Sequence, residues 1–173
     1  MMFDILKSEQ EKAYNFIQKN HENGSFSHAY IVEAKNYNNL DLFLQYFVSN
    51  LLNEDSVDIN NNADVYIIKP DNGMIKKNQI DELQKRFFTK SVVSKKKVYI
   101  MYGADKMNDV SSNSLLKFIE EPAENIFAIL VTENRFGLLT TILSRCQTIK
   151  LKSKSLEKNE DDVYNIIYYT ASS

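Results

Sequence analysis

Five short, mostly apolar runs constrain the fold of this chain more than any other feature. The runs occupy residues 29–32, 65–68, 98–101, 126–131 and 148–151. Runs of this length and character are typical of strands that are buried on both faces of a sheet. Because helical segments separate them, they predict right-handed crossovers and an α/β domain with a parallel sheet of five strands.

Amphipathic periodicity predicts the helices that cover this sheet. Helices are expected from Ser8, as an N-terminal cap, through about Asn20, at residues 40–52 and 77–88, and from Ser111 or Ser112 to Pro122. Past Leu151 the chain becomes polar, and residues 163–169 form one more amphipathic stretch. We therefore expect an α/β domain over residues 1–152, and a linker with the start of a second domain over residues 153–173.

Composition narrows the possible cofactors and compartments. Cys146 is the only cysteine, which excludes an internal disulfide and a four-cysteine zinc site, so we expect no metal. We also expect no cofactor, because the residues of a nucleotide site are missing. The first ten residues lack the pattern of a signal peptide. No apolar run approaches the ~18–20 residues that a membrane span needs, so a cytoplasmic protein is expected.

Charge is distributed unevenly along the chain. The formal net charge of -2 argues against bulk attraction to nucleic acid or membranes. Residues 69–97 nevertheless carry nine Lys and Arg against three Asp and Glu. This segment is either a solvated face or a surface turned toward DNA or an acidic partner, and Phe87 and Phe88 beside Arg86 would favour nucleic acid if both were exposed.

The sequence lacks the residues of a nucleotide site. In an open parallel sheet a nucleotide binds beyond the carboxyl ends of the strands, where glycines let backbone N–H groups wrap the phosphates and a lysine neutralises them. Residues 25–72 contain no glycine, and Glu33 and Asp41 would repel a triphosphate. The third strand is followed by Tyr102-Gly103 rather than by carboxylates for magnesium and water. The sequence therefore predicts a domain that cannot hydrolyse ATP.

One arginine is placed to act outside its own domain. Residues 113–146 are expected to form a helix, a turn, an apolar strand, a polar loop and a short helix that ends at Ser144-Arg145-Cys146. This arrangement can carry Arg145 to the edge of the domain, where its guanidinium could reach a phosphate held by a neighbour. The local alternative is a surface ion pair with Glu133 or Glu121.

Four segments carry a resemblance to a known family. They are Ser27-His28-Ala29-Tyr30, Ala104-Asp105-Lys106-Met107, residues 113–122 and Ser144-Arg145-Cys146. Through them, residues 26–151 resemble the AAA+ modules of bacterial DNA polymerase III clamp-loader subunits, and the delta-prime type most of all. The resemblance implies a three-layer P-loop-NTPase-like fold with strand order 5-1-4-3-2, followed by a small helical lid domain.

Aligned on the family's pattern, the nucleotide site is degenerate. Ala34, Tyr37 and Asn39 replace three glycines, Leu40 the lysine, Asp41 the Ser/Thr that binds magnesium, and Tyr102 and Gly103 two carboxylates. Asp105 lies three residues beyond the first carboxylate position and is expected to be a surface or helix-capping residue. Thr132 and Asn134, where ATPases of the family place a polar sensor, are expected to be loop and cap residues.

The same resemblance implies a role in trans. Arg145, within the motif formed with Ser144 and Cys146, would be an arginine finger for a neighbouring ATPase subunit, and Cys146 itself is expected to be a packing residue. The chain would be a non-hydrolysing member of the clamp loader, with gamma/tau and delta subunits as partners and with the sliding clamp and primer-template DNA reached through the complex. The alternatives are a gamma/tau-type ATPase subunit and a nucleic-acid-binding module that uses the basic residues 69–97.

Overall fold

Five parallel strands form the centre of the fold, as the apolar runs predict. The computed structural model describes residues 2–88 and 95–153. The strands are β1 (Ala29–Glu33), β2 (Val65–Ile68), β3 (Lys97–Met101), β4 (Ile126–Thr132) and β5 (Gln147–Lys150). They lie in the order β2-β3-β4-β1-β5, and every neighbouring pair is parallel, which confirms the order implied by the resemblance.

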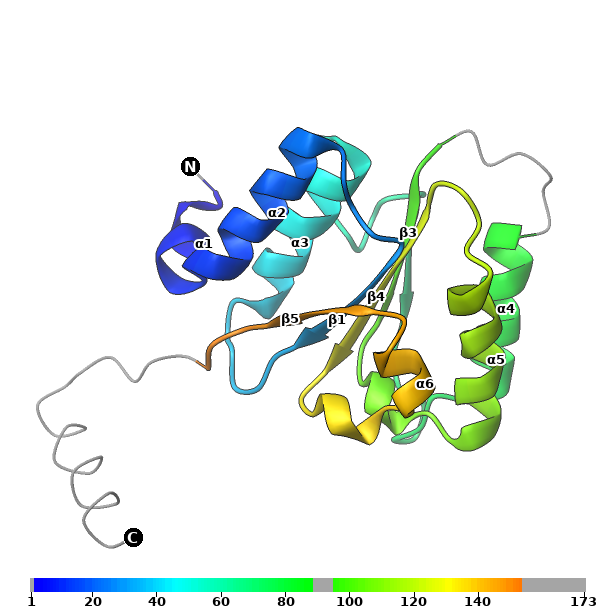
Figure 1. The fold of residues 1–173 in the computed structure, drawn as a ribbon. Coiled ribbons are helices and arrows are strands. Elements are labelled where there is room, and N and C mark those ends of the chain that lie inside the picture. Colours follow the sequence, from blue (N-terminus) through cyan, green and yellow to red (C-terminus); the bar gives the residue numbers. More distant parts are fainter. Residues whose placement is uncertain (1, 89–94, 154–173) are drawn as a thin grey trace, which may run out of the picture.

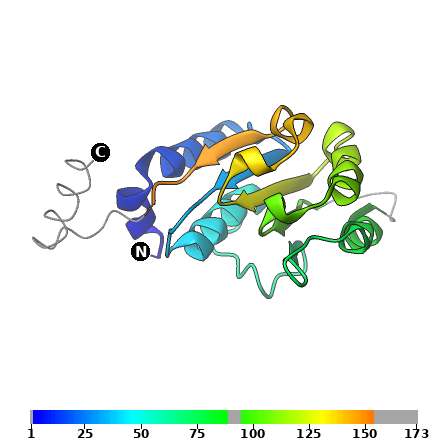
Figure 2. The same ribbon diagram turned by 90° about the horizontal axis from the view of Figure 1, so that it is seen from below.

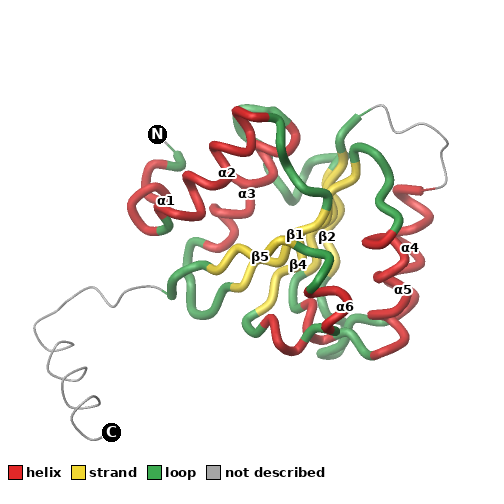
Figure 3. Tube along the Cα trace, in the orientation of Figure 1, coloured by secondary structure: helices red, strands yellow, loops and turns green. Residues whose placement is uncertain are grey.

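Helices cover both faces of this sheet and give the three layers seen in Figure 1, Figure 2 and Figure 3. The helices are α1 (Asp4–Glu9), α2 (Glu11–Asn23), α3 (Leu40–Leu52), α4 (Lys77–Phe88), α5 (Asp109–Glu120) and α6 (Thr140–Leu143), with 3-10 turns η1 (Ala104–Lys106) and η2 (Arg135–Gly137). Helices α1, α2 and α3 lie on one face, and α4 and α5 on the other. The bounds of α3, β2 and α4 are those predicted, and the other strand bounds differ by one residue.

The core has two halves because successive strand side chains point to opposite faces. Tyr30 and Val32 of β1 belong to the cluster under α1–α3, whereas Ala29 and Ile31 belong to the cluster under α4 and α5. All strands are parallel, so their carboxyl ends meet at one edge of the sheet, which we call the carboxyl edge. A nucleotide would bind at this edge.

Two helix starts differ from the prediction. The first helical region is divided at Gln10, whose φ of -130° and ψ of 50° are not helical, so Ser8 lies inside α1 and donates to Ile5 O instead of capping a helix. Helix α5 is capped by Asn108, whose side chain accepts from Ser111 N at 2.9 Å, rather than by Ser111 or Ser112. The expected linker and lid, residues 153–173, lie outside the described residues except for Ser153.

Candidate functional site

Arg145 lies on the surface just after α6, and its side chain is 40% exposed. Its Nη1 donates to Thr141 O at 2.9 Å, and its Nη2 lies 3.1 Å from Glu120 Oε1 at the end of α5. The Glu120 side chain is 43% exposed, so this is a surface ion pair, worth at most about 1 kcal/mol. The ion-pair alternative is therefore present, but with Glu120 as the partner instead of Glu133 or Glu121. Such a contact leaves the guanidinium free to exchange partners.

The neighbours of Arg145 in the motif have local roles. Ser144 Oγ donates to Thr141 O at 3.1 Å, which closes the last turn of α6. Cys146 is partly buried and packs against the core cluster under α4 and α5. Burial raises the pKa of the Cys146 thiol to about 12, so this thiol is a neutral packing group rather than a nucleophile at physiological pH.

This protonation state gives a testable expectation for Cys146. At pH 8 the folded protein should react with DTNB at least ~10-fold more slowly than the urea-unfolded chain, because only the thiolate reacts. The rate in the folded protein should rise with pH toward the raised pKa. Equal rates in folded and unfolded protein would show that the thiol is accessible and ionised, contrary to the packing role.

The loop that follows β1 is held by side chains in place of a ligand. Ala34 is buried, and its N–H donates to Thr132 O at 2.9 Å. Tyr37 Oη and Asn39 Nδ2, at two of the former glycine positions, both donate to Glu9 Oε2, at 2.8 and 2.9 Å. Burial, helped by the hydrogen bond to Glu9, raises the pKa of Tyr37. In place of a bound phosphate, this loop has side-chain hydrogen bonds to Glu9, in another segment of the same chain.

The two halves of the former nucleotide site are bonded directly to each other. Asp41, at the magnesium-binding position, accepts at its Oδ1 from Tyr102 Oη at 2.8 Å, and Tyr102 stands at a carboxylate position. Burial and this hydrogen bond raise the pKa of Tyr102, so the phenol stays a donor. Leu40, at the lysine position, packs against the core. No cation in this set is available for a phosphate.

Gly103 shows why the second carboxylate position has no side chain. Its φ is +61°, and a Cβ built there would lie 2.8 Å from Pro70 Cγ. L-residues rarely adopt this backbone conformation, and the proline ring is rigid. A glutamate at this position would require both the loop and Pro70 to move.

We expect Gly103→Ala to lower the free energy of unfolding by roughly 2–4 kcal/mol, because backbone strain and a clash add together. Gly24 offers a matched control, since its φ is also +61° but nothing lies within 4 Å of an added Cβ. Gly24→Ala should therefore cost only about 1–2 kcal/mol. Urea unfolding of both variants measures the difference, and equal losses would contradict the contact with Pro70.

A polar network at the ends of β3 and β4 corrects the expectation for Asp105. The buried Thr132 Oγ1 donates to Asp105 Oδ1 at 2.7 Å and accepts from Asn134 N at 3.1 Å. Asp105 is neither a surface residue nor a cap; it joins η1 to β4, because a buried hydroxyl needs a partner. Asn134 caps η2 by accepting from Phe136 N, as expected. Glu33 accepts from Arg135 N at 2.8 Å.

Three lysines of the basic segment form ion pairs with its three acidic residues, which leaves six of its nine basic residues outside these pairs. Lys76 pairs with Asp71, Lys77 with Asp81 and Lys85 with Glu82. Phe87 is buried in the core, so it offers no stacking platform for a base, and Arg86 lies over the Tyr66 ring at 5.1 Å. The condition that would favour nucleic acid, exposed aromatic residues beside the basic ones, is therefore not met at Phe87.

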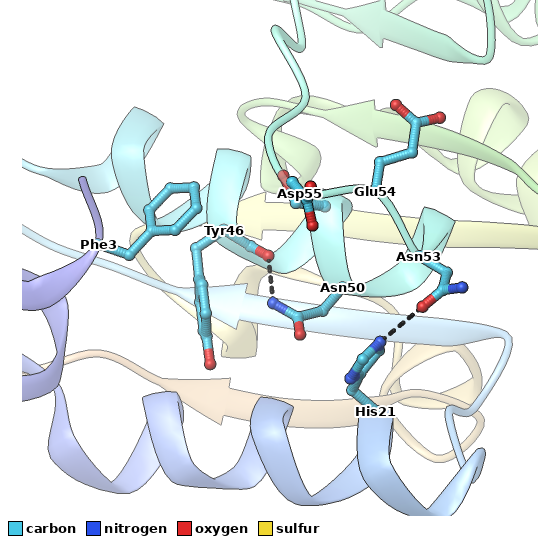
Figure 4. Close-up of a pocket in the computed structure, with 8 residues that line it drawn as sticks. Phe3, His21, Tyr46, Asn50, Asn53, Glu54 and Asp55 are labelled. Atoms are coloured by element: carbon cyan, nitrogen blue, oxygen red, sulfur yellow. Dashed lines mark hydrogen bonds between the residues drawn. The ribbon is translucent and has the colours of Figure 1, made fainter. Parts of the chain in front are cut away.

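Two cavities lie away from the nucleotide position. One of about 250 Å³ is lined by residues of α2, α3 and the following loop, including His21, Tyr46 and Asn53 (Figure 4). A second, of about 360 Å³, shares His21 and Asn53 and adds Lys96. Helix α2 ends just before β1 begins, so both lie toward the amino edge of the sheet.

Two searches over the described residues bear on other classes of protein. Within residues 2–88 and 95–153, no three His, Cys, Asp or Glu side chains gather in a way that could hold a metal ion. Across the same part of the chain, no helix combines the length and the apolar character that crossing a membrane requires.

The strand order and the helices that cover both faces of the sheet define an AAA+-type α/β module. A family model described as "DNA polymerase III, delta subunit" matches residues 9–155. The chain belongs to this clamp-loader family, and its relatives include subunits of the delta-prime type as well as gamma and gamma/tau subunits. It is similar to DNA polymerase III subunit delta' of Bacillus subtilis, with 38% identity over 87% of this chain and 50% of the relative.

A second comparison of sequences supports the family, and a comparison with solved structures supports the fold. DNA polymerase III subunit delta' of Haemophilus influenzae is 30% identical over 57% of this chain and 34% of its own length. A gamma subunit-related protein of Thermotoga maritima shares the fold, with a TM-score of 0.63 at 18% identity over 91% of this chain and 49% of that one. The chain thus spans half or less of the length of the relatives it matches.

Proposed function

We propose that this chain is the AAA+ module of a delta-prime-type clamp-loader subunit that does not hydrolyse ATP and that supplies Arg145 to an adjacent ATPase subunit. The subunit would act in the cytoplasm with gamma/tau and delta subunits. Through the assembled complex it would support loading of the sliding clamp onto primed DNA. The observation that carries this proposal is the pairing of a nucleotide position that has Leu40 in place of the lysine and Asp41 bonded to Tyr102 with a surface arginine in a weak ion pair.

The closed nucleotide position supports the non-hydrolysing part. Hydrolysis requires a lysine and a magnesium site to neutralise charge on the transferred phosphoryl group. Here Leu40 is packed and Asp41 is bonded to Tyr102, so neither requirement is met. This argues against the alternative of a gamma/tau-type ATPase subunit.

The surroundings of Arg145 support the finger. A guanidinium offers five donors in a planar fork that fits two phosphate oxygens, and only Nη1 and Nη2 of Arg145 have partners here. Exchanging a half-exposed carboxylate for a neighbour's phosphate costs little, because the existing pair is screened by water. The alternative of a nucleic-acid-binding module loses support, because Phe87 is buried and cannot stack on a base.

The test is a reconstitution with the full-length gene product. Tagged protein should retain gamma/tau and delta subunits from the same organism in a pull-down, and the complex should load clamp onto primed DNA. Omitting the protein should abolish loading. If the protein does not join the complex, or if loading proceeds at the same rate without it, the proposal fails.

A further inference from the structure

Gln10 makes an unusual long-range contact at the carboxyl edge. It lies in the break between α1 and α2, and only 3% of it is exposed. Its Nε2 donates to Lys152 O at 2.9 Å, and its Oε1 accepts from Lys152 N at 2.8 Å. One side-chain amide therefore pairs with both backbone groups of a residue 142 positions away, as a neighbouring strand would.

The position of Lys152 explains why it needs such a partner. Strand β5 pairs with β1 as far as Lys150 opposite Glu33, and Leu151 N still donates to Glu33 O at 2.9 Å. Beyond that point β1 turns away into the loop toward α3, so the strand ladder offers Lys152 no partner. The amide of Gln10 continues the ladder by one residue and fixes the path of the chain as it leaves the sheet.

The adjacent residue, Glu9, holds the other segment that leaves the sheet here. Its Oε2 accepts from Tyr37 and Asn39 in the loop after β1. Two consecutive residues of one helix junction thus fasten the β1–α3 loop and the exit of β5. The break at Gln10 makes this possible, because residues i and i+1 of a continuous helix point in directions about 100° apart.

We propose that Glu9 and Gln10 form a ligand-independent clamp that couples the β1–α3 loop to the chain leaving β5, and so fixes the backbone position of Lys152. In this role the junction supplies the loop with the polar partner that a phosphate would supply to a glycine-rich loop. Glu9 and Gln10 are positioning residues, and the inference goes beyond the proposed function because it does not depend on Arg145 or on ring assembly.

Hydrogen exchange tests the clamp directly. In wild-type protein the Lys152 amide should be protected, and Gln10→Leu, of similar size but without polar atoms, should raise its exchange rate at least ~10-fold, as expected for local opening. Amides inside β1 and β4 should keep their protection. Gln45→Leu is a matched control, because Gln45 donates to the exposed Ser56 Oγ instead of to the backbone of β5.

A second variant keeps the test decisive if Gln10→Leu folds poorly. In Gln10→Glu the carboxylate can accept from Lys152 N but cannot donate to Lys152 O, whereas the protonated acid can do both. The protection factor at Lys152, corrected for intrinsic exchange, should therefore increase as the pH falls through the range where that carboxyl group titrates. Glu9→Gln should change protection in the β1–α3 loop and at Lys152 together. Unchanged exchange at Lys152 in folded Gln10→Leu, or a uniform rise across the sheet, would overturn the clamp.

Discussion

ATP hydrolysis by the subunit adjacent to this chain should slow when Arg145 is replaced by alanine. A guanidinium that enters a neighbour's site neutralises charge on the transferred phosphoryl group, which is worth ~10³–10⁵ in rate for GTPases. A ring with several sites dilutes this effect, so we expect a loss of roughly twofold or more in the bulk rate. The measurement is the ATPase rate, stimulated by DNA and clamp, of a complex reconstituted with full-length proteins.

Arg145→Ala should have little effect on the stability of the fold. Arg145 loses one ion pair with half-exposed Glu120 and one bond to Thr141 O, so the free energy of unfolding should fall by about 0.5 kcal/mol or less. Arg145→Lys keeps the charge but loses the planar fork, and it should give an intermediate rate.

Arg135→Ala is a matched control for Arg145→Ala. Arg135 lies near the carboxyl edge, with its guanidinium over the Phe136 ring at 4.9 Å. Its replacement should leave the partner's ATPase rate unchanged. An Arg145→Ala complex that assembles and hydrolyses ATP at the wild-type rate would reduce Arg145 to an ordinary surface residue.

The elements were predictable where burial dominates the sequence pattern. Residues 40–52 and 65–68 were bounded correctly because apolar periodicity ends sharply there. Periodicity could not find the break at Gln10, because the partner that Gln10 meets there, Lys152, is far away in the sequence. Nor could it choose Asn108 over Ser111 as the cap of α5, since both side chains can accept from a helix N–H. Strand order came from the resemblance alone.

The candidate site, too, could be predicted only in part. Which residues replace the glycines, the lysine and the carboxylates could be read by alignment on the family's pattern. How those replacements interact could not be read, because Tyr102 and Asp41 are 61 positions apart and nothing local marks them as a pair. Nothing in the sequence marked Glu9 as part of the site, because it is one acidic residue on an amphipathic helix. The mistaken expectation for Asp105 has the same origin, since its partner Thr132 is distant in sequence.

The interactions at the carboxyl edge make a definite prediction about nucleotide. Isothermal titration of this chain with Mg-ATP should show no heat of binding up to millimolar concentrations. Two bonded pairs occupy the polar groups that face the former site, Tyr102 with Asp41 and Tyr37 with Glu9. Breaking the partly buried bond between Tyr37 and Glu9 would cost roughly 1–3 kcal/mol, whereas the exposed bond between Tyr102 and Asp41 would cost less, because water can replace it. Binding of ATP would not offset this cost, because Asp41 and Glu33 would repel its phosphates and Leu40 stands at the position of the family's lysine.

Tyr102→Phe tests whether Mg-ATP fails to bind because Tyr102 blocks the site or because the site lacks a lysine. The variant frees Asp41 from its hydrogen bond, yet it should bind Mg-ATP no better than wild type, because the lysine position is still Leu40. A gamma/tau subunit of the same organism, titrated under identical conditions, is the positive control. A micromolar dissociation constant for the wild-type chain would contradict the degenerate site. Binding by Tyr102→Phe alone would show that Tyr102 blocks a site that is otherwise competent, so that closure rather than charge would be what keeps nucleotide out.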